Sequence, residues 1–354
     1  MNQKRLLAID TFFHTVEDTV VLSNISPVNL TAIEKALRKR IHNPSFEYKN
    51  PKDVWEEYLH VLDVIQLQDT PLERLLNKKR IELITKIKML LDRSNDNFTK
   101  QSIKIYGKPS KTLLTKAYKI LELEKEVPPE KIDAKSAEKM LKKAFKEMNL
   151  KWKLVKQQRM ASAVISPSTR TLILKKKARF TKRFVERLIV HELGTHALRA
   201  ENGRLQPYKI FQHGTAHYLA TEEGLASYNE EMAGCSSRSI MRAYAGRVVA
   251  VEYALTHSFK ETYKYLLKFF ASKTAKILTL RAKRGLLDTS KPGAFTKDIL
   301  YLKGYFQIKQ FVKKGGDIRQ LYIGKICVED LEEIKTLTSL GVNLKPVFLP
   351  AHLQ

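Results

Sequence analysis

The chain is poor in cysteine and in long apolar runs, and both absences narrow the class of protein. It has two cysteines in 354 residues, which is too few for a disulfide framework and is typical of a reducing compartment. No apolar run reaches the ~18 residues that a membrane-spanning helix needs. Asp10 interrupts the N-terminal residues before an apolar core forms. We therefore predict no signal peptide, no membrane partner and a cytoplasmic location.

Acidic residues are also scarce relative to basic ones. The chain has 64 Lys and Arg against 37 Asp and Glu, a net charge of +27. The imbalance is greatest between Lys151 and Arg183, where 11 residues are basic and none is acidic. This charge would attract an acidic peptide tail, but it would attract nucleic acid as well. A lysine-rich, well-solvated surface without a partner is the third interpretation, so charge alone does not exclude nucleic acid.

A histidine motif carries the clearest chemical signal. His191 and His196 are the ends of H-E-L-G-T-H, and an acidic pair, Glu222 and Glu223, follows in T-E-E-G-L-A. Two imidazoles and one carboxylate can hold one Zn²⁺ ion and leave a coordination position open. Zinc polarises a scissile carbonyl, while Glu192 is placed to take a proton from the attacking water and pass it to the leaving amine. The motif therefore predicts a zinc-dependent hydrolase with Glu192 as general base and acid.

The spacing of the two histidines is unusual, because they are five residues apart. Four residues return a side chain to within about 40° around a helix, whereas five leave the two side chains about 140° apart. One wide π-type turn would restore the common direction, and Gly194 lowers the cost of such a distortion. The sequence therefore predicts a distorted turn between Leu193 and His196.

The surrounding sequence predicts the fold class. Helical periodicity dominates residues 1–146, with a break at Pro128-Pro129. Strands are predicted just before the motif, at Leu150–Lys156, Met160–Ile165 and Thr171–Lys175. We predict an α+β fold, mostly helical, with a small mainly antiparallel sheet packed on the active-site helix. The predicted division is an N-terminal helical region, 1–146, and a catalytic region, 147–354.

Longer motifs resemble a known family. The run H-E-L-G-T-H-A-L-R-A-E-N-G-R-L-Q-P, together with T-E-E-G-L-A, is similar to the microtubule-associated tyrosine carboxypeptidase family. Bacterial members carry Q-E-G-L-A, and residues 222–226 are a one-letter variant of it. The resemblance continues through Arg281–Gly304 and G-K-I near Gly324, and more weakly through N-P-S-F-E-Y near Asn43. It implies a zinc metallocarboxypeptidase that releases a C-terminal Tyr or Phe from a protein or peptide.

The resemblance also selects the third ligand. It implies that Glu223, the residue before Gly-Leu-Ala, binds zinc with the two histidines. Glu222 is then a candidate partner of a ligand, and an acid at a helix N-terminus is the alternative interpretation. His213 and His217, four residues apart, are alternative ligands, although no general base accompanies them.

A carboxypeptidase also needs a cation for the terminal carboxylate of its substrate, and an arginine fork suits that group. Arg199 is the first candidate, with a structural or solvated role as its alternative. Arg284 and Lys297 are further candidates. Asn202 and Tyr301 also match the family and are candidate substrate-binding residues, with a possible oxyanion contact from Tyr301.

Three functions remain open from sequence. The first is the tyrosine or phenylalanine carboxypeptidase, acting on an acidic protein tail, with tubulin as the partner only if the host has it. The second is an exopeptidase similar to dipeptidyl peptidase III, which has the same histidine spacing and works from the amino end. The third is a basic binding or regulatory protein with a residual metal site, against which the intact Glu192 argues.

Overall fold

The computed structural model describes residues 3–51, 53–124, 126, 131–157, 163–175 and 179–354. The chain divides into two compact units, each built from two separate segments. Unit 1 comprises Met1–Glu124 and Arg238–Lys303, and unit 2 comprises Lys125–Ser237 and Gly304–Gln354. The division predicted between residues 146 and 147 does not coincide with these units, and it stays a prediction about the chain.

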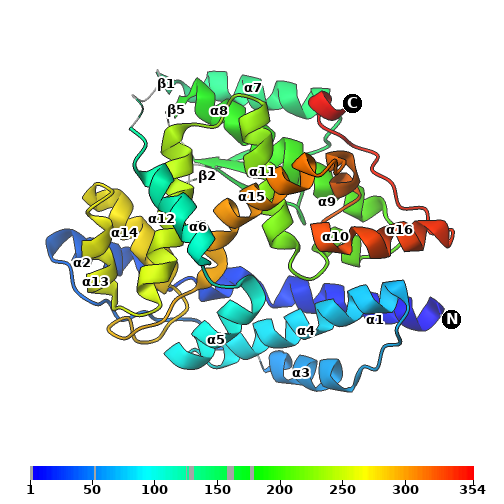
Figure 1. Cartoon of the computed structure of the whole chain (residues 1–354), viewed down its shortest axis with the longest axis horizontal. Helices are drawn as coiled ribbons and strands as arrows, with labels where there is room; N and C mark the ends of the chain where they lie inside the picture. Colours follow the sequence, from blue (N-terminus) through cyan, green and yellow to red (C-terminus); the bar gives the residue numbers. More distant parts are fainter. Residues whose placement is uncertain (1–2, 52, 125, 127–130, 158–162, 176–178) are drawn as a thin grey trace. The chain divides into compact units, whose positions relative to one another are not determined.

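Unit 1 consists of helices joined by loops, and an isolated antiparallel β-bridge joins Ser45 to Asp288. Its elements are α1 Gln3–Thr19, η1 Leu22–Ile25, α2 Leu30–Lys39, α3 Val54–Val64, α4 Pro71–Leu91, α5 Asn95–Tyr106, α6 Lys111–Leu121, α12 Arg238–Ala254, α13 Phe259–Leu266, α14 Ser272–Lys283 and the 3₁₀ turn η3 Thr296–Ile299. Helix α12 packs against α6 and α14 (Figure 1). In the part of the chain that the structure describes, no helix combines the length and apolarity needed to cross a membrane.

Local sequence signals explain where several of these helices begin. Thr70 caps α4 by accepting a hydrogen bond from the Glu73 amide, and Pro71 occupies the first helical position. Ser258 and Glu261 form a capping box at the start of α13. These caps satisfy amide groups that a helix leaves unpaired, so the helix starts follow from side chains that the sequence shows.

Unit 2 contains the strands and both motif helices. Its elements are β1 Lys131–Ile132, α7 Ala134–Glu147, β2 Lys153–Gln157, β3 Ala163–Ser166, β4 Thr171–Lys175, β5 Phe180–Thr181, α8 Lys182–Leu188, η2 Ile189–Ala197, α9 Leu198–Leu205, α10 Ile210–His213, α11 Tyr218–Met232, η4 Ile318–Tyr322, η5 Val328–Asp330, α16 Leu331–Ser339 and η6 Ala351–Leu353. Helix α15, Leu300–Lys313, begins in unit 1 and continues into unit 2.

The strands confirm the predicted α+β class. Strand β4 pairs in parallel with β2 and antiparallel with β3, and β1 pairs antiparallel with β5, so two of the three pairings among the described strands are antiparallel. The predicted strand Met160–Ile165 begins outside the described residues, and β3 is described from Ala163. All of these strands are short, and the fold is mostly helical.

The three-stranded sheet is fastened to α9, the continuation of the histidine helix. Glu201 of α9 accepts a hydrogen bond from Trp152 at 3.0 Å and two from Arg170 at 2.9 and 2.8 Å. Arg170, one of the basic residues between Lys151 and Arg183, is therefore neutralised by an ion pair within the chain. Lys156 is likewise paired, with Glu138 of α7.

Two glycines from separate motifs let α11 and α15 approach closely. Gly224 belongs to T-E-E-G-L-A and Gly304 ends the motif that starts at Arg281. A methyl group added to Gly224 would overlap the backbone of Gly304, and one added to Gly304 would overlap the carbonyl of Ala220. The two motifs are therefore joined by a backbone contact that only glycine permits.

This contact predicts a large effect of one methyl group. We expect Gly304→Ala to lower the free energy of unfolding by about 1–3 kcal/mol, because the added atom has no space. The matched control is Gly194→Ala, where the nearest atom outside the residue would be the Ile189 carbonyl oxygen at 3.5 Å, an ordinary contact. Urea denaturation of both variants is the measurement. Equal stability of the two variants would contradict the packing argument.

Candidate metal centre

The histidine motif lies in a π-helix. This segment, η2, spans Ile189–Ala197, directly after α8 and before α9. Hydrogen bonds in a π-helix join residues five apart, so His191 and His196 come onto one face. The predicted distortion between Leu193 and His196 is confirmed, and it is longer than a single turn. Gly194 has room for a methyl group, so the distortion does not depend on the absence of its side chain.

Three side chains converge on one point from η2 and α11. The Nε2 atoms of His191 and His196 lie 3.8 and 3.9 Å from Oε2 of Glu223, and the three ligand atoms are all within 4.8 Å of one another. A tetrahedral zinc with bonds of about 2.1 Å would hold its ligand atoms about 3.4 Å apart, so a small contraction suffices. Among the described residues, this is the one group of three side chains that could hold a metal ion.

Each histidine is oriented by a carboxylate on its other nitrogen. Nδ1 of His191 is 2.6 Å from Glu230, and Nδ1 of His196 is 2.9 Å from Glu222. A carboxylate at this position accepts a hydrogen bond from Nδ1–H, so Nε2 is the atom that is available to a metal. Glu222 thus has the contact expected of a ligand's partner. Glu230 was not predicted from the sequence, and it is fully buried beside Arg187, which donates to it at 2.9 Å.

The carboxylates control the charge of this centre. Burial alone would lower the pKa of His196, but the hydrogen bond and charge of Glu222, with the charges of Glu192 and Glu223, outweigh it and raise that pKa to about 9. Burial would raise the pKa of Glu222, yet Arg199 and His196 lower it to about 2. A metal ion that binds the metal-free chain must therefore displace a proton from His196.

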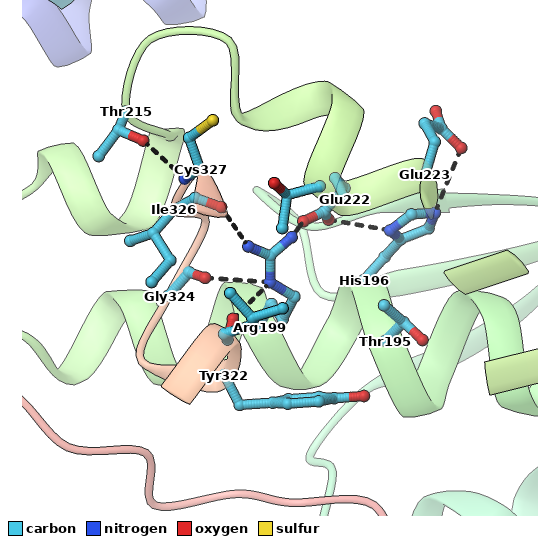
Figure 2. Close-up of polar contacts among 12 residues, drawn as sticks. Thr195, His196, Arg199, Thr215, Glu222, Glu223, Tyr322, Gly324, Ile326 and Cys327 are labelled. Carbon is cyan, nitrogen blue, oxygen red and sulfur yellow. Dashed lines mark hydrogen bonds and ion pairs between the residues drawn. The ribbon is translucent and has the colours of Figure 1, made fainter. Parts of the chain in front are cut away.

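Arg199 contacts Glu222, the carboxylate that is hydrogen-bonded to His196. Its side chain is fully buried and donates to Glu222 (Figure 2). It also donates to three backbone carbonyls, those of Leu321 at 2.9 Å, Gly324 at 3.1 Å and Ile326 at 2.7 Å. These contacts favour the structural interpretation of Arg199 over the binding of a terminal carboxylate. Two of these acceptors, the carbonyls of Gly324 and Ile326, belong to the G-K-I motif.

Tyr322 and Asn229 stabilise the π-helix. The amide of Leu198 donates to the carbonyls of Leu193 and Thr195, and the intervening carbonyl of Gly194 receives the Tyr322 hydroxyl at 2.8 Å. Asn229 of α11 donates to that hydroxyl at 2.8 Å and to the Thr195 hydroxyl at 2.9 Å. A carbonyl inside the wide turn therefore accepts a hydrogen bond from a residue of a distant segment.

Removing this hydroxyl should loosen the metal centre. We expect Tyr322→Phe to remove the hydrogen bond to the Gly194 carbonyl and to leave one buried N–H of Asn229 without its acceptor, at a cost of about 1–3 kcal/mol, and to weaken zinc binding about tenfold. The control is Tyr305→Phe, which removes a unit 2 hydroxyl bonded to Glu231 instead. Competition with a zinc chelator gives the affinities. Equal zinc affinity of the two variants would show that Tyr322 does not support the turn.

The other predicted binding residues are divided between the units. Asn202 is buried in α9 and holds the C-terminal segment, accepting from the amides of Val347 and Phe348 and donating to the Phe348 carbonyl. Its contacts are structural. Arg284, Lys297 and Tyr301 belong to unit 1. Their roles toward a substrate stay predictions.

The structure bears on two predictions made for residues 213–223, which concern the start of the helix and the alternative ligands. Helix α11 begins at Tyr218, after His217 in a left-handed conformation, so Thr221 lies inside the helix and does not cap it. The Thr221 hydroxyl instead accepts from the Val328 amide at 3.0 Å. Glu222 and Glu223 are therefore past the first turn. His213 and His217 do not belong to the group of three potential ligands found among the described residues.

Comparisons with known proteins agree with the motifs. The family model described as "Microtubule-associated tyrosine carboxypeptidase" matches residues 36–354. A mouse protein (Mus musculus), "Putative tyrosine carboxypeptidase MATCAP2", is 34% identical over 176 residues, which are 48% of this chain and 33% of that protein. Another mouse protein, "Microtubule-associated tyrosine carboxypeptidase 1", is 30% identical over 172 residues, 47% of this chain and 36% of the relative. The matched region thus spans about a third of each relative's length.

Proposed function

This chain belongs to the microtubule-associated tyrosine carboxypeptidase family, and we propose that it is a zinc-dependent carboxypeptidase that releases a C-terminal Tyr or Phe from a protein or peptide. The observation that carries the proposal is the convergence of His191, His196 and Glu223 beside a general-base candidate in one buried centre. Family membership supports the carboxypeptidase class, and the relatives' names supply the terminal tyrosine.

The donor set fits zinc, since two imidazoles and one carboxylate form a common catalytic zinc site. His191, His196 and Glu223 would hold the ion. When bound, zinc would supply Lewis acidity to the scissile carbonyl and to the attacking water. Glu230 and Glu222 keep a proton on Nδ1 of each histidine, so both rings present Nε2.

Glu192 has the position of a proton carrier. It follows His191 directly in η2, and its side chain is only partly buried. Its carboxylate would take a proton from the attacking water and deliver it to the amine of the released residue. The charge of Glu192 contributes to the raised pKa of His196, which is consistent with its place beside the centre.

The substrate we propose is an acidic protein tail. The basic residues between Lys151 and Arg183 would attract such a tail, and tubulin is the candidate if the host contains it. Arg284 and Lys297 are still the predicted cations for the terminal carboxylate, and Tyr301 the predicted oxyanion contact. A cytoplasmic location is also part of the proposal; both cysteines, Cys235 and Cys327, are free and buried.

A peptide panel tests this function. Two preparations of the purified chain are compared, one loaded with zinc and one stripped of metal by a chelator. Each is incubated with peptides ending in Tyr, Phe, Ala and Lys, and the products are identified by mass spectrometry. We expect the zinc-loaded protein to remove Tyr or Phe only, and the stripped protein to remove nothing. Trimming from the amino end would instead support the exopeptidase alternative. No cleavage by the zinc-loaded protein would favour the binding protein.

A further inference from the structure

Three arginines surround one buried carboxylate in unit 1. Asp298, in η3, is 1% exposed. Arg281, in the last turn of α14, donates to both of its oxygens, and Arg284, just after that helix, donates to Oδ1 at 3.3 Å. Arg247 of α12 is near enough for its charge to act on the same carboxylate. These four side chains, Arg247, Arg281, Arg284 and Asp298, are called the arginine cluster below.

The arginine cluster carries more positive charge than it neutralises. Burial would raise the pKa of Asp298, but Arg281, Arg284 and Arg247 hold it well below its usual range, so the carboxylate is ionised. One negative charge then faces three positive ones within the cluster. The charges of the four side chains thus sum to two positive charges in a partly buried place, where solvent screens them less than at the surface.

Two donors of the arginine cluster are available to a further acceptor. Among the described residues, Nη1 of Arg247 and Nε of Arg284 are buried and make no hydrogen bond. A buried donor without a partner costs about 1–3 kcal/mol, and more when it is charged, so an anion that accepted from these groups would recover that free energy. The side chains of Arg281 and Arg284 are 29% and 23% exposed, so a ligand can reach the cluster from solvent.

Aromatic stacking fixes the orientation of Arg247. Its guanidinium carbon lies 3.9 Å from the centre of the Tyr301 ring, and Tyr301 in turn stacks on Tyr244 at 5.3 Å and 21°. A stacked guanidinium keeps its donors at the edge of a fixed plane, which suits a planar anion with two oxygens. Arg247 lies outside the Arg281–Gly304 motif, so the motif alone did not indicate it.

We propose that the arginine cluster binds a carboxylate of an acidic polypeptide. The fork of Arg247 and the exposed edges of Arg281 and Arg284 hold the two oxygens, while Asp298 fixes Arg281 and Arg284. The assignment to a polypeptide rests on the proposed function, whereas the anion site rests on the contacts within unit 1. The carboxylate belongs either to the chain end or to a Glu or Asp side chain, and both have the same chemistry.

Peptide binding to the full chain tests this site without hydrolysis. The Glu192→Gln protein is titrated into a fluorescent Glu-rich peptide ending in Tyr, and anisotropy gives the dissociation constant. Arg247→Gln is added to this background, with Arg247→Lys as the variant that keeps charge but lacks the fork. The matched control is Arg40→Gln, which removes the same charge from an exposed position in unit 1. Thermal melting confirms that each variant is folded.

We expect Arg247→Gln to weaken binding at least about tenfold, Arg247→Lys to weaken it less, and Arg40→Gln to change it less than about twofold. A peptide amidated at its C-terminus and one with Gln in place of Glu identify the source of the carboxylate. Equal losses in Arg247→Gln and Arg40→Gln would reduce the site to general charge attraction and overturn the proposal. No binding by the parent protein would also overturn it, as would inorganic phosphate binding more tightly than the peptide.

The outcomes separate this site from the proposed function. Cleavage of terminal Tyr by the wild-type chain, with peptide binding unaffected by Arg247→Gln, would retain the enzyme and remove the site. Binding that depends on Arg247, without any cleavage by the zinc-loaded wild type, would retain the site and remove the enzyme. The first measurement uses hydrolysis and the second uses equilibrium binding, so neither result determines the other.

Discussion

Replacing Glu192 by Gln is expected to reduce the release of terminal Tyr or Phe by about 10²–10⁴-fold while zinc stays bound. The amide keeps the shape of the side chain but cannot accept a proton from water. Glu192 is not one of the three side chains whose ligand atoms converge, so its replacement leaves those donors in place. Turnover of a Tyr-ending peptide and the zinc content of the same preparation are the two measurements.

The control for Glu192→Gln is the same substitution in the preceding helix. Glu186 of α8 has a side chain that is 43% exposed, and its contact is an ion pair with Lys182 at 3.7 Å. Glu186→Gln should retain full activity and zinc. If Glu192→Gln kept activity within tenfold of the wild type, proton transfer would have to be assigned to another group. If it lost zinc as well, its effect could not be assigned to catalysis.

Local spacing in the sequence was enough to predict the main features of the centre. Two histidines five residues apart cannot share a face of a regular helix, so the wide turn followed from geometry once a common metal was assumed. Glu230 was also within reach of such reasoning. It lies seven residues after Glu223 on the same helix, which is two turns later on the same face.

Features that depend on distant contacts were not predictable in this way. Tyr322 meets Gly194 across 128 residues, and no local pattern marks it. Arg199 suggested substrate binding because it lies near the histidines, whereas its complete burial depends on carbonyls from residues 321–326. The return of residues 238–303 to unit 1 could not be predicted from local sequence either, because it depends on contacts between segments that are distant in the chain.

Exchanging each acid of the Glu222-Glu223 pair for Gln should produce two different losses. Removal of a carboxylate that orients a metal-binding histidine typically costs about 10–100-fold in metal affinity, so loss of the proposed ligand Glu223 should cost more than about 100-fold. From the sequence alone, Glu222→Gln would be expected to leave the metal affinity unchanged. The structure predicts a loss of about 10–100-fold, because Glu222 accepts a hydrogen bond from Nδ1 of His196 at 2.9 Å.

The free energy of unfolding should rank the same two variants in the opposite order, with the larger loss in Glu222→Gln. Glu222 is the acidic partner of Arg199, which is fully buried, so Glu222→Gln leaves a buried positive charge uncompensated. We expect a loss of about 3–5 kcal/mol in the free energy of unfolding of the zinc-free protein. Glu223→Gln should cost about 1 kcal/mol, because it removes weaker contacts at 3.8 and 3.9 Å.

A third variant on the same helix controls for the substitution itself. Glu231→Gln alters an acid that contacts Tyr305 and Lys309 at the surface, and it should change neither zinc affinity nor stability by much. Zinc affinity is measured by chelator competition, and stability by urea denaturation in excess chelator. If Glu222→Gln lost zinc more completely than Glu223→Gln, the ligand would be Glu222. The fold would then have to release that carboxylate from Arg199 when metal binds, since Arg199 is the cation that holds it in the zinc-free chain.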